Sequence, residues 1–292
     1  MKNISPIYRL HFIVLLWGFT GVVGKLISLS AMPLVFLRMF FTATIIYFFL
    51  RIKKHSLRVN RKILTKLILI GFIIALHWYT FFLSIKISNV AVALSTLSTG
   101  AFFTALLQPI FLNKKIQLSE IFFAVIVSVC IVLIFNAEVK YFWGIVIGLI
   151  CSFLSALFSV LNAKIHQQYN ASVIVFYEIV GGCALVFLLI FFDNSYTELI
   201  HIKNIDIFWT LILAGLLTAY PMIESVSLMK YFSPYTLLLT VNLEPVYGII
   251  LAYFVWKEQE QMSILFYICT ATILLVLVLD SLLKNYQAKK EK

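Results

Sequence analysis

Charged residues are scarce in this sequence. Of its 292 residues, 12% are charged and 62% are hydrophobic. A soluble domain carries about 25% charged residues, so an ordinary water-soluble fold is excluded. At about 20 apolar residues for each membrane-spanning helix, about ten spans with short connections use nearly the whole chain. No room remains for a soluble domain of any size.

Motifs of enzymes and metal sites are also absent from the sequence. There is no GxSxG, HExxH, Walker loop or dinucleotide fingerprint, so the chain carries no ATP motor and no recognisable catalytic centre. The five histidines do not fall at the spacing of metal ligands. The four cysteines lie singly within apolar segments, which indicates neither a disulfide framework nor a zinc site. We therefore expect no cofactor and no metal.

Basic residues are grouped between the apolar segments, although the formal net charge is +11. They form no stripe interleaved with aromatic residues, so we expect no nucleic-acid partner. If the N-terminus is inside, alternate loops place 17 Lys and Arg residues on the cytoplasmic side and 5 on the other side. By the positive-inside rule, the sequence predicts a multi-pass protein of the inner (plasma) membrane with both termini cytoplasmic.

Hydropathy predicts an all-α membrane protein. The expected spans are 10–28, 32–50, 67–86, 89–112, 118–135, 142–162, 172–192, 207–229, 234–256 and 263–283. The connections are mostly short, so successive helices should be antiparallel neighbours. The first span is expected to remain in the protein rather than to be cleaved as a signal peptide, because many spans follow it.

The two halves of the chain resemble each other. A shift of 144 residues lays 75–119 on 219–263 without a gap, and the expected helix boundaries agree across both halves. Each half holds five expected spans, an odd number, so the second half must enter the membrane in the opposite orientation. We therefore predict two inverted five-helix repeats, 1–136 and 137–292. This plan recurs in secondary carriers, whose substrate site lies near the bilayer midplane.

Ionisable residues within spans are costly to bury in lipid unless they are partnered. His77 and Glu244 each lie about ten residues into a span, roughly 15 Å deep at 1.5 Å per residue, which is near the midplane. Pro245 follows Glu244 and removes a helical hydrogen bond, which frees a backbone carbonyl. This carboxyl can therefore hold a proton or a cationic substrate group; alternatively, it stays protonated or pairs with a neighbouring helix. His77 either lines the same site or bridges two helices as a neutral imidazole.

Other polar residues in the spans have both a structural and a functional interpretation. A shift of 140 aligns Arg38 with Glu178, and inversion places them toward opposite faces, as structural pairs within each half or as a gate. We expect a structural or gating role for Glu224, and we expect Lys25 to extend its amine to the outer surface. One face of the sixth span carries small polar residues, which suit close helix packing or a cavity wall: Ser152, Ser155, Ser159 and Asn162.

Four segments resemble the EamA-type branch of the drug/metabolite transporter superfamily. They are LWGFTG at 16–21, LRM at 37–39, LHW at 76–78 and NLEPVYGI at 242–249. The resemblance covers nearly the full chain, and it implies a ten-helix inverted-repeat carrier with a central cavity, often an exporter of amino acids or other metabolites. The family's acidic residue after the fourth span is replaced here by Asn-Lys-Lys at 113–115.

These observations predict a secondary transporter, an exporter of a small metabolite such as an amino acid, that works by alternating access around a midplane site. The expected partners are the small-molecule substrate and the lipid bilayer, with proton coupling as the candidate driving force. The expected lining combines polar groups with aromatic walls: Arg38, His77, Asn242 and Glu244, and Trp17, Trp78 and Tyr247. Two alternatives are an intramembrane enzyme, with Glu244 and His77 as acid and base, and a membrane scaffold that transports nothing.

Overall fold

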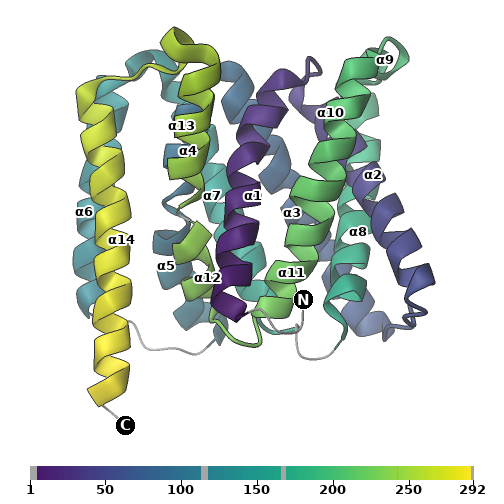
Figure 1. The fold of residues 1–292 in the computed structure, drawn as a ribbon, viewed down its shortest axis with the longest axis horizontal. Coiled ribbons are helices and arrows are strands. Elements are labelled where there is room, and N and C mark those ends of the chain that lie inside the picture. Colours follow the sequence, from purple (N-terminus) through teal and green to yellow (C-terminus); the bar gives the residue numbers. More distant parts are fainter. Residues whose placement is uncertain (1–4, 113–117, 166–168, 242, 291–292) are drawn as a thin grey trace.

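The computed structural model describes residues 5–112, 118–165, 169–241 and 243–290, which form helices and turns without a strand. The helices stand side by side in a bundle (Figure 1). The first helix, α1 (Pro6–Leu26), begins at the same end of the bundle at which the last helix, α14 (Ile264–Lys290), finishes. We call this end the termini end and the opposite end the far end.

The remaining helices follow in chain order. The first half contains α2 (Ala31–Ile52), α3 (Arg61–Ile87), α4 (Val90–Leu97), α5 (Gly100–Leu112) and α6 (Leu118–Ala137). The second half contains α7 (Phe142–Asn162), α8 (Ala171–Phe192), α9 (Tyr196–Ile200), α10 (Asn204–Ala214), α11 (Tyr220–Leu228), α12 (Pro234–Val241) and α13 (Glu244–Trp256). Three shorter turns join them: η1 (Val139–Tyr141), the π-helical η2 (Gly215–Ala219) and η3 (Lys257–Glu260).

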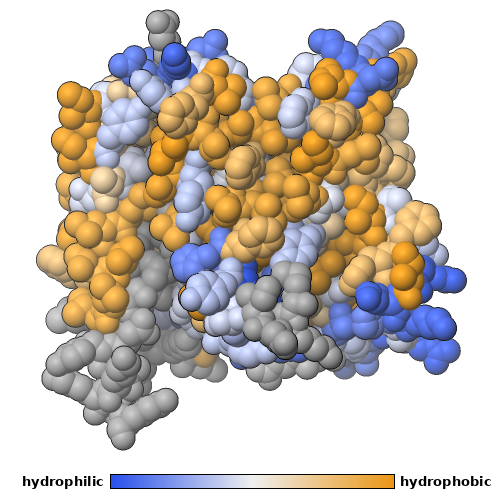
Figure 2. Space-filling view, in the orientation of Figure 1, coloured by the Kyte–Doolittle hydropathy of each residue, from blue (hydrophilic) through white to orange (hydrophobic). Residues whose placement is uncertain are grey.

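The bundle has the surface of a membrane protein. Within the described residues, seven helices are long and apolar enough to cross a membrane, and three shorter apolar helices of 10–17 residues accompany them. Side chains such as Phe48 and Phe192 are 59% and 84% exposed. Figure 2 shows hydrophobic side chains over the middle of the visible face and hydrophilic ones along its upper edge and at its lower right. An exposed apolar surface of this extent suits contact with lipid.

Two of the predicted spans, 89–112 and 234–256, are each made of two helices. A turn at Ser98 and Thr99 separates α4 from α5, and α12 ends at Val241 before α13 begins at Glu244. The shift of 144 residues brings these two interruptions to the same position. The sequence predicted each of these spans as one continuous helix, the later one with Pro245 inside it.

Pro245 explains why the later of these spans is divided. It occupies the first turn of α13, where the missing backbone N–H has no helical partner to lose. Glu244 therefore lies at a helix N-terminus, where the partial positive charge of the helix favours a carboxylate. The sequence predicted that Pro245 would free a backbone carbonyl within a continuous helix. In the structure, a new helix begins there instead.

The helices of the two halves pack reciprocally. α1 packs against α13 of the second half, while α7 packs against α4 and α5 of the first half. α2 packs against α8, and α6 packs against α14. α1 runs from the termini end, whereas α7 starts beside the last turns of α3, where Ser84 Oγ donates a hydrogen bond of 2.8 Å to the Gly144 carbonyl.

Gly71 allows α3 to lie directly against α8. A Cβ atom at this position would stand 2.0 Å from the backbone oxygen of Glu178 and 2.9 Å from the amide nitrogen of Gly182. The obstruction is backbone, so a side chain cannot be accommodated by a rotamer change. Gly215 aligns with Gly71 under the shift of 144 residues. A Cβ atom at Gly215 would lie 3.4 Å from the flexible end of the Ile45 side chain, which is an ordinary contact.

We predict that Gly71→Ala destabilises the protein because α3 and α8 must move apart. Overpacking of this kind costs about 1–3 kcal/mol or more. The measurement is thermal unfolding in detergent, with Gly215→Ala as the matched control, which should unfold near the wild-type temperature. Equal unfolding temperatures for Gly71→Ala and wild type would show that the helices are not in direct backbone contact.

Candidate functional site

A cavity lies inside the bundle, between helices of both halves. It holds about 870 Å³ of empty space, its open mouth included. Most of its wall is apolar, with a few polar groups. The lining residues are Leu10, Trp17, Thr20, Arg38, His77, Trp78, Phe81, Leu97, Ser155, Phe158, Ser159, Asn162, Met222, Ser225, Val226, Met229, Leu237, Val241 and Glu244.

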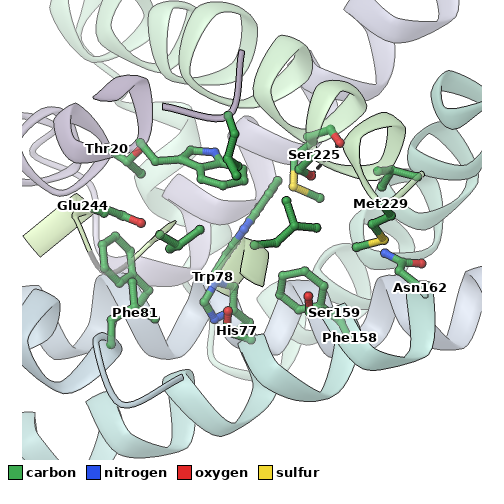
Figure 3. Close-up of a pocket in the computed structure, with 18 of the residues that line it drawn as sticks. Thr20, His77, Trp78, Phe81, Phe158, Ser159, Asn162, Ser225, Met229 and Glu244 are labelled. Carbon is green, nitrogen blue, oxygen red and sulfur yellow. Dashed lines mark hydrogen bonds between the residues drawn. The ribbon is translucent and has the colours of Figure 1, made fainter. Parts of the chain in front are cut away.

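The cavity extends from the middle of the bundle toward the termini end. In Figure 3, Glu244 lies on one side of it and Met229 and Asn162 lie on the other, with Trp78 between them. Asn162 is the last residue of α7, and Met229 directly follows α11. Leu10 lies near the start of α1. Together with Asn162 and Met229, it forms the part of the cavity wall that is nearest the termini end.

Arg38 of α2 brings a buried positive charge to the cavity wall. Its side chain is 3% exposed, and its Nε donates a hydrogen bond of 2.9 Å to Thr218 Oγ1. The guanidinium carbon stands 3.8 Å from the centre of the Trp78 ring, a cation–π contact. In the part of the chain that the structure describes, no carboxylate oxygen lies within 4.0 Å of its nitrogens. The fork of the guanidinium is thus held in place while its charge remains available to an anion.

The π-helical turn η2 supplies the hydroxyl that holds Arg38. Thr218 Oγ1 donates to the carbonyl of Leu213, five residues earlier, at 2.5 Å, and accepts from Arg38 on the other side. π-turns are rare in proteins as a whole, and those that occur are often found at functional sites. Thr218 was not predicted from the sequence, since hydropathy does not distinguish a π-turn from an ordinary helical turn.

His77 of α3 is oriented by the backbone of α7. Its Nδ1 lies 3.0 Å from the Cys151 carbonyl oxygen, which can only accept, so Nδ1 carries the hydrogen. In the neutral ring, Nε2 is then the acceptor. The ring also packs against Phe158, with 5.4 Å between the ring centres. His77 therefore both bridges two helices and lines the cavity, which were the two alternatives the sequence left open.

The structure brings five of the seven predicted site residues together. The residues that line the cavity are Trp17, Arg38, His77, Trp78 and Glu244. Tyr247 is not part of the described wall; it packs where α13 meets α1, and a Cβ atom on Gly18 would lie 2.7 Å from the Tyr247 Cβ. Asn242 and the 113–115 segment lie outside the described residues.

The small polar face of α7 divides between the two predicted roles. Ser155, Ser159 and Asn162 line the cavity. Ser152 instead serves packing, because its Oγ accepts from Thr99 Oγ1 at 2.9 Å and donates to the Leu97 carbonyl at 3.1 Å. A further lining face, formed by α11 and the residue after it, was not predicted, although its spacing of three and four residues is visible in the sequence: Met222, Ser225, Val226 and Met229.

A buried acid ties three elements together at the far end. Glu260 is fully buried in η3, and its carboxylate accepts from Lys25 Nζ at 2.7 Å. It also accepts from the backbone amides of Val90 at 3.2 Å and Ala91 at 2.9 Å, the first residues of α4. Lys25, which was expected to reach the surface, instead pairs with Glu260 and lies 4.5 Å from the centre of the Trp256 ring.

The link between α1 and α2 is held at the same end. Asp206 accepts from the Ser28 amide at 2.7 Å and from its hydroxyl at 2.6 Å, and Glu198 accepts from the Ser30 amide at 2.8 Å. At the termini end, α1 is joined to α11 by the ion pair of Arg9 with Glu224. The structure thus gives Glu224 a structural partner, and the far end is closed by the denser polar network.

We predict that Glu260→Ala speeds hydrogen exchange at the Val90 and Ala91 amides. Hydrogen bonds to charged groups contribute about 1.5–3 kcal/mol, so loss of the acceptor should accelerate exchange by about tenfold or more. Glu198→Ala is the control, and it should affect the Ser30 amide alone. Unchanged exchange at both α4 amides would show that Glu260 does not hold the far end together.

Comparisons with known proteins agree with this architecture. A model of the EamA-like transporter family matches the chain twice, over residues 9–136 and 142–280. A solved structure titled "Crystal structure of protein" matches with a TM-score of 0.66 and 15% identity, covering 96% of this chain and 98% of that chain. At that identity the likeness concerns the fold alone. No curated protein matches.

Proposed function

The chain belongs to the EamA-like transporter family, and from this premise we propose that it is a secondary transporter, an exporter of a small metabolite such as an amino acid. The observation that supports this most directly is the buried guanidinium of Arg38, unpaired within the described residues, on the wall of a cavity that also holds Glu244. A solute with a carboxylate and an amine would satisfy both groups. The apolar remainder of the wall suits a solute of modest size.

We propose ten spans arranged as two inverted repeats, 1–136 and 137–292. The two interrupted spans that coincide under the shift of 144, and the reciprocal packing of α1 and α7, support this division. Interrupted helices that meet near the midplane are a recurrent way to build a carrier site. Alternating access would rock one repeat against the other, with the structure representing the state open toward the termini end.

In the substrate-bound state, each polar group has a proposed role. Arg38 binds the substrate carboxylate through the two nitrogens that Thr218 leaves free, and Trp78 keeps the guanidinium plane fixed. Glu244 binds the amine or a proton, and His77 accepts a hydrogen bond through Nε2. The enzyme alternative gains no support, because no hydrogen bond joins His77 to Glu244 in the described chain.

We propose that both termini are cytoplasmic in the inner (plasma) membrane, as the distribution of basic residues indicates. Reporter fusions after Arg61 and after Lys290 should both report the cytoplasm. A periplasmic signal from either fusion would reverse the proposed orientation.

The first experiment is a thermal-shift screen of the purified protein against metabolites. Compounds that stabilise the protein are then tested for flux in vesicles. A compound recovered unchanged on the other side supports the carrier, whereas a chemically altered one supports the enzyme. A scaffold would show neither stabilisation nor flux.

We predict that Arg38→Lys weakens binding of the carboxylate substrate while the protein still reaches the membrane. Lysine keeps the charge but loses the planar fork, and loss of one charged hydrogen bond corresponds to about tenfold or more in affinity. Arg51→Lys, on the exposed end of the same helix, is the control and should bind normally. Normal binding by Arg38→Lys would remove this residue from the ligand site.

We predict that Glu244→Gln abolishes transport driven by a pH gradient but retains exchange of substrate for substrate. Glutamine keeps the shape and the hydrogen bonding of glutamate but cannot titrate. Vesicles with and without an imposed pH gradient provide the measurement, and Asp193→Asn at the surface provides the control. If wild type and Glu244→Gln respond to the gradient equally, Glu244 is not the coupling site.

A further inference from the structure

Basic side chains gather where α2 leads into α3 at the termini end, and the proposed transport cycle uses none of them. We call this set the basic corner: Arg51, Lys53, Lys54, Arg58, Arg61, Lys62 and Lys66. All of them are exposed, and in the described structure no carboxylate oxygen lies within 4.0 Å of their nitrogens. No Asp or Glu precedes Glu120 in the sequence, so neither α2 nor α3 provides a counter-charge.

Lys54 stands where the end of a helix ordinarily has glycine. Its φ is 52°, and the His55 amide donates a hydrogen bond of 3.0 Å to the Leu50 carbonyl, as in a Schellman C-terminus. Glycine is preferred at such a position because a Cβ atom strains the left-handed backbone. A lysine here therefore costs conformational energy and adds a positive charge to the basic corner.

Arg61 and Lys62 also occupy unfavourable positions. They are the first two residues of α3, whose first turn has no acidic residue, and the partial positive charge of a helix N-terminus disfavours cations. The positive-inside rule counts the basic residues on one side of the membrane, wherever in the link they lie. It explains neither these two positions nor a lysine in left-handed backbone, so the concentration of charge requires a further explanation.

The backbone of the basic corner is fixed to the bundle, which keeps its charges together. The Tyr177 hydroxyl donates to the Leu57 carbonyl at 2.6 Å, and the Asn60 amide donates to the Tyr169 hydroxyl at 3.2 Å. Leu57 and Val59 pack against the main hydrophobic core. A surface that is already ordered loses little conformational freedom when it binds a partner.

Exposed apolar side chains lie on the same two helices. Phe48 and Ile52 of α2 and Leu69 of α3 are all more than half exposed. Figure 1 shows α2 ending at the lower right, where Figure 2 shows hydrophilic side chains beside hydrophobic ones. A phospholipid offers a phosphate to the first kind and acyl chains to the second, whereas a soluble anion leaves the apolar side chains in water.

We propose that the basic corner is a docking surface for the headgroups of anionic phospholipids in the adjacent membrane leaflet. Clusters of about four to eight Lys and Arg residues beside a membrane span are typical of sites for anionic lipids. The lipid phosphates provide the counter-charge that α2 and α3 lack, and the acyl chains cover the exposed apolar side chains. This binding involves no transported substrate, so the inference does not depend on the proposed function.

The test is native mass spectrometry of the full chain in neutral detergent, titrated with phosphatidylglycerol or with phosphatidylcholine of the same acyl chains. The wild type should bind phosphatidylglycerol more tightly. Lys54→Gln combined with Arg58→Gln should lower this affinity by about tenfold or more, since each basic residue near the membrane surface contributes about fivefold. Lys140→Gln combined with Lys203→Gln removes two exposed charges from the far end and is the matched control, which should bind like the wild type.

Three results would overturn the proposal. The first is equal affinity of the wild type for the two lipids, and the second is an equal loss of affinity in the two double variants. The third is displacement of phosphatidylglycerol by glycerol 3-phosphate or inorganic phosphate at the concentration of the lipid, which would identify a site for soluble anions.

Lys54→Gly keeps the proposal testable if the double variant does not fold. Glycine relieves the left-handed strain, so this variant should unfold at a higher temperature than the wild type in detergent with phosphatidylcholine. Its affinity for phosphatidylglycerol should nevertheless fall by about fivefold. Unchanged affinity in this variant would contradict a role for the basic corner in lipid binding.

Discussion

Arg38 stands in the bundle interior with its guanidinium on Trp78 and its Nε on Thr218, and no carboxylate oxygen of the described residues lies within 4.0 Å of its nitrogens. A buried charge without a partner is expensive, so the surrounding structure must compensate by other means. The ring of Trp78, the hydroxyl from the π-turn and the field of Glu244 at a helix N-terminus do this in part. In the proposed function, a substrate anion completes the compensation.

The interrupted spans explain how a lipid-facing bundle can hold such a site. A continuous helix satisfies its own backbone and offers only side chains to a cavity. An interruption near the middle of the membrane places a helix start inside the protein, and Glu244 occupies one of these starts. The two interrupted spans, one from each range that the family model matches, pack against each other, α4 against α13 and α5 against α12.

Much of this architecture could be predicted from the sequence, because lipid imposes a long apolar run on every span. The apolar helices and three of the lining residues, Arg38, His77 and Glu244, follow from hydropathy and from the rarity of ionisable residues within spans. The family resemblance follows from four short motifs, two of which contain the lining residues Trp17 and Trp78. The helix interruptions, the π-turn that presents Thr218 and the Lys25–Glu260 contact could not be predicted in this way. They depend on packing between distant segments, as does the placement of Tyr247 at the contact of α1 with α13 rather than in the cavity.

Alternating access predicts that the cavity becomes accessible from each face of the membrane in turn, and the accessibility of one residue can measure this. Ser159 lines the cavity and is 4% exposed. In a variant without native cysteines, Ser159→Cys should react with an impermeant thiol reagent added from either face of sealed vesicles, faster from the termini side. A transported compound should raise the rate from the far side. Reaction from one face alone, with and without that compound, would contradict the account.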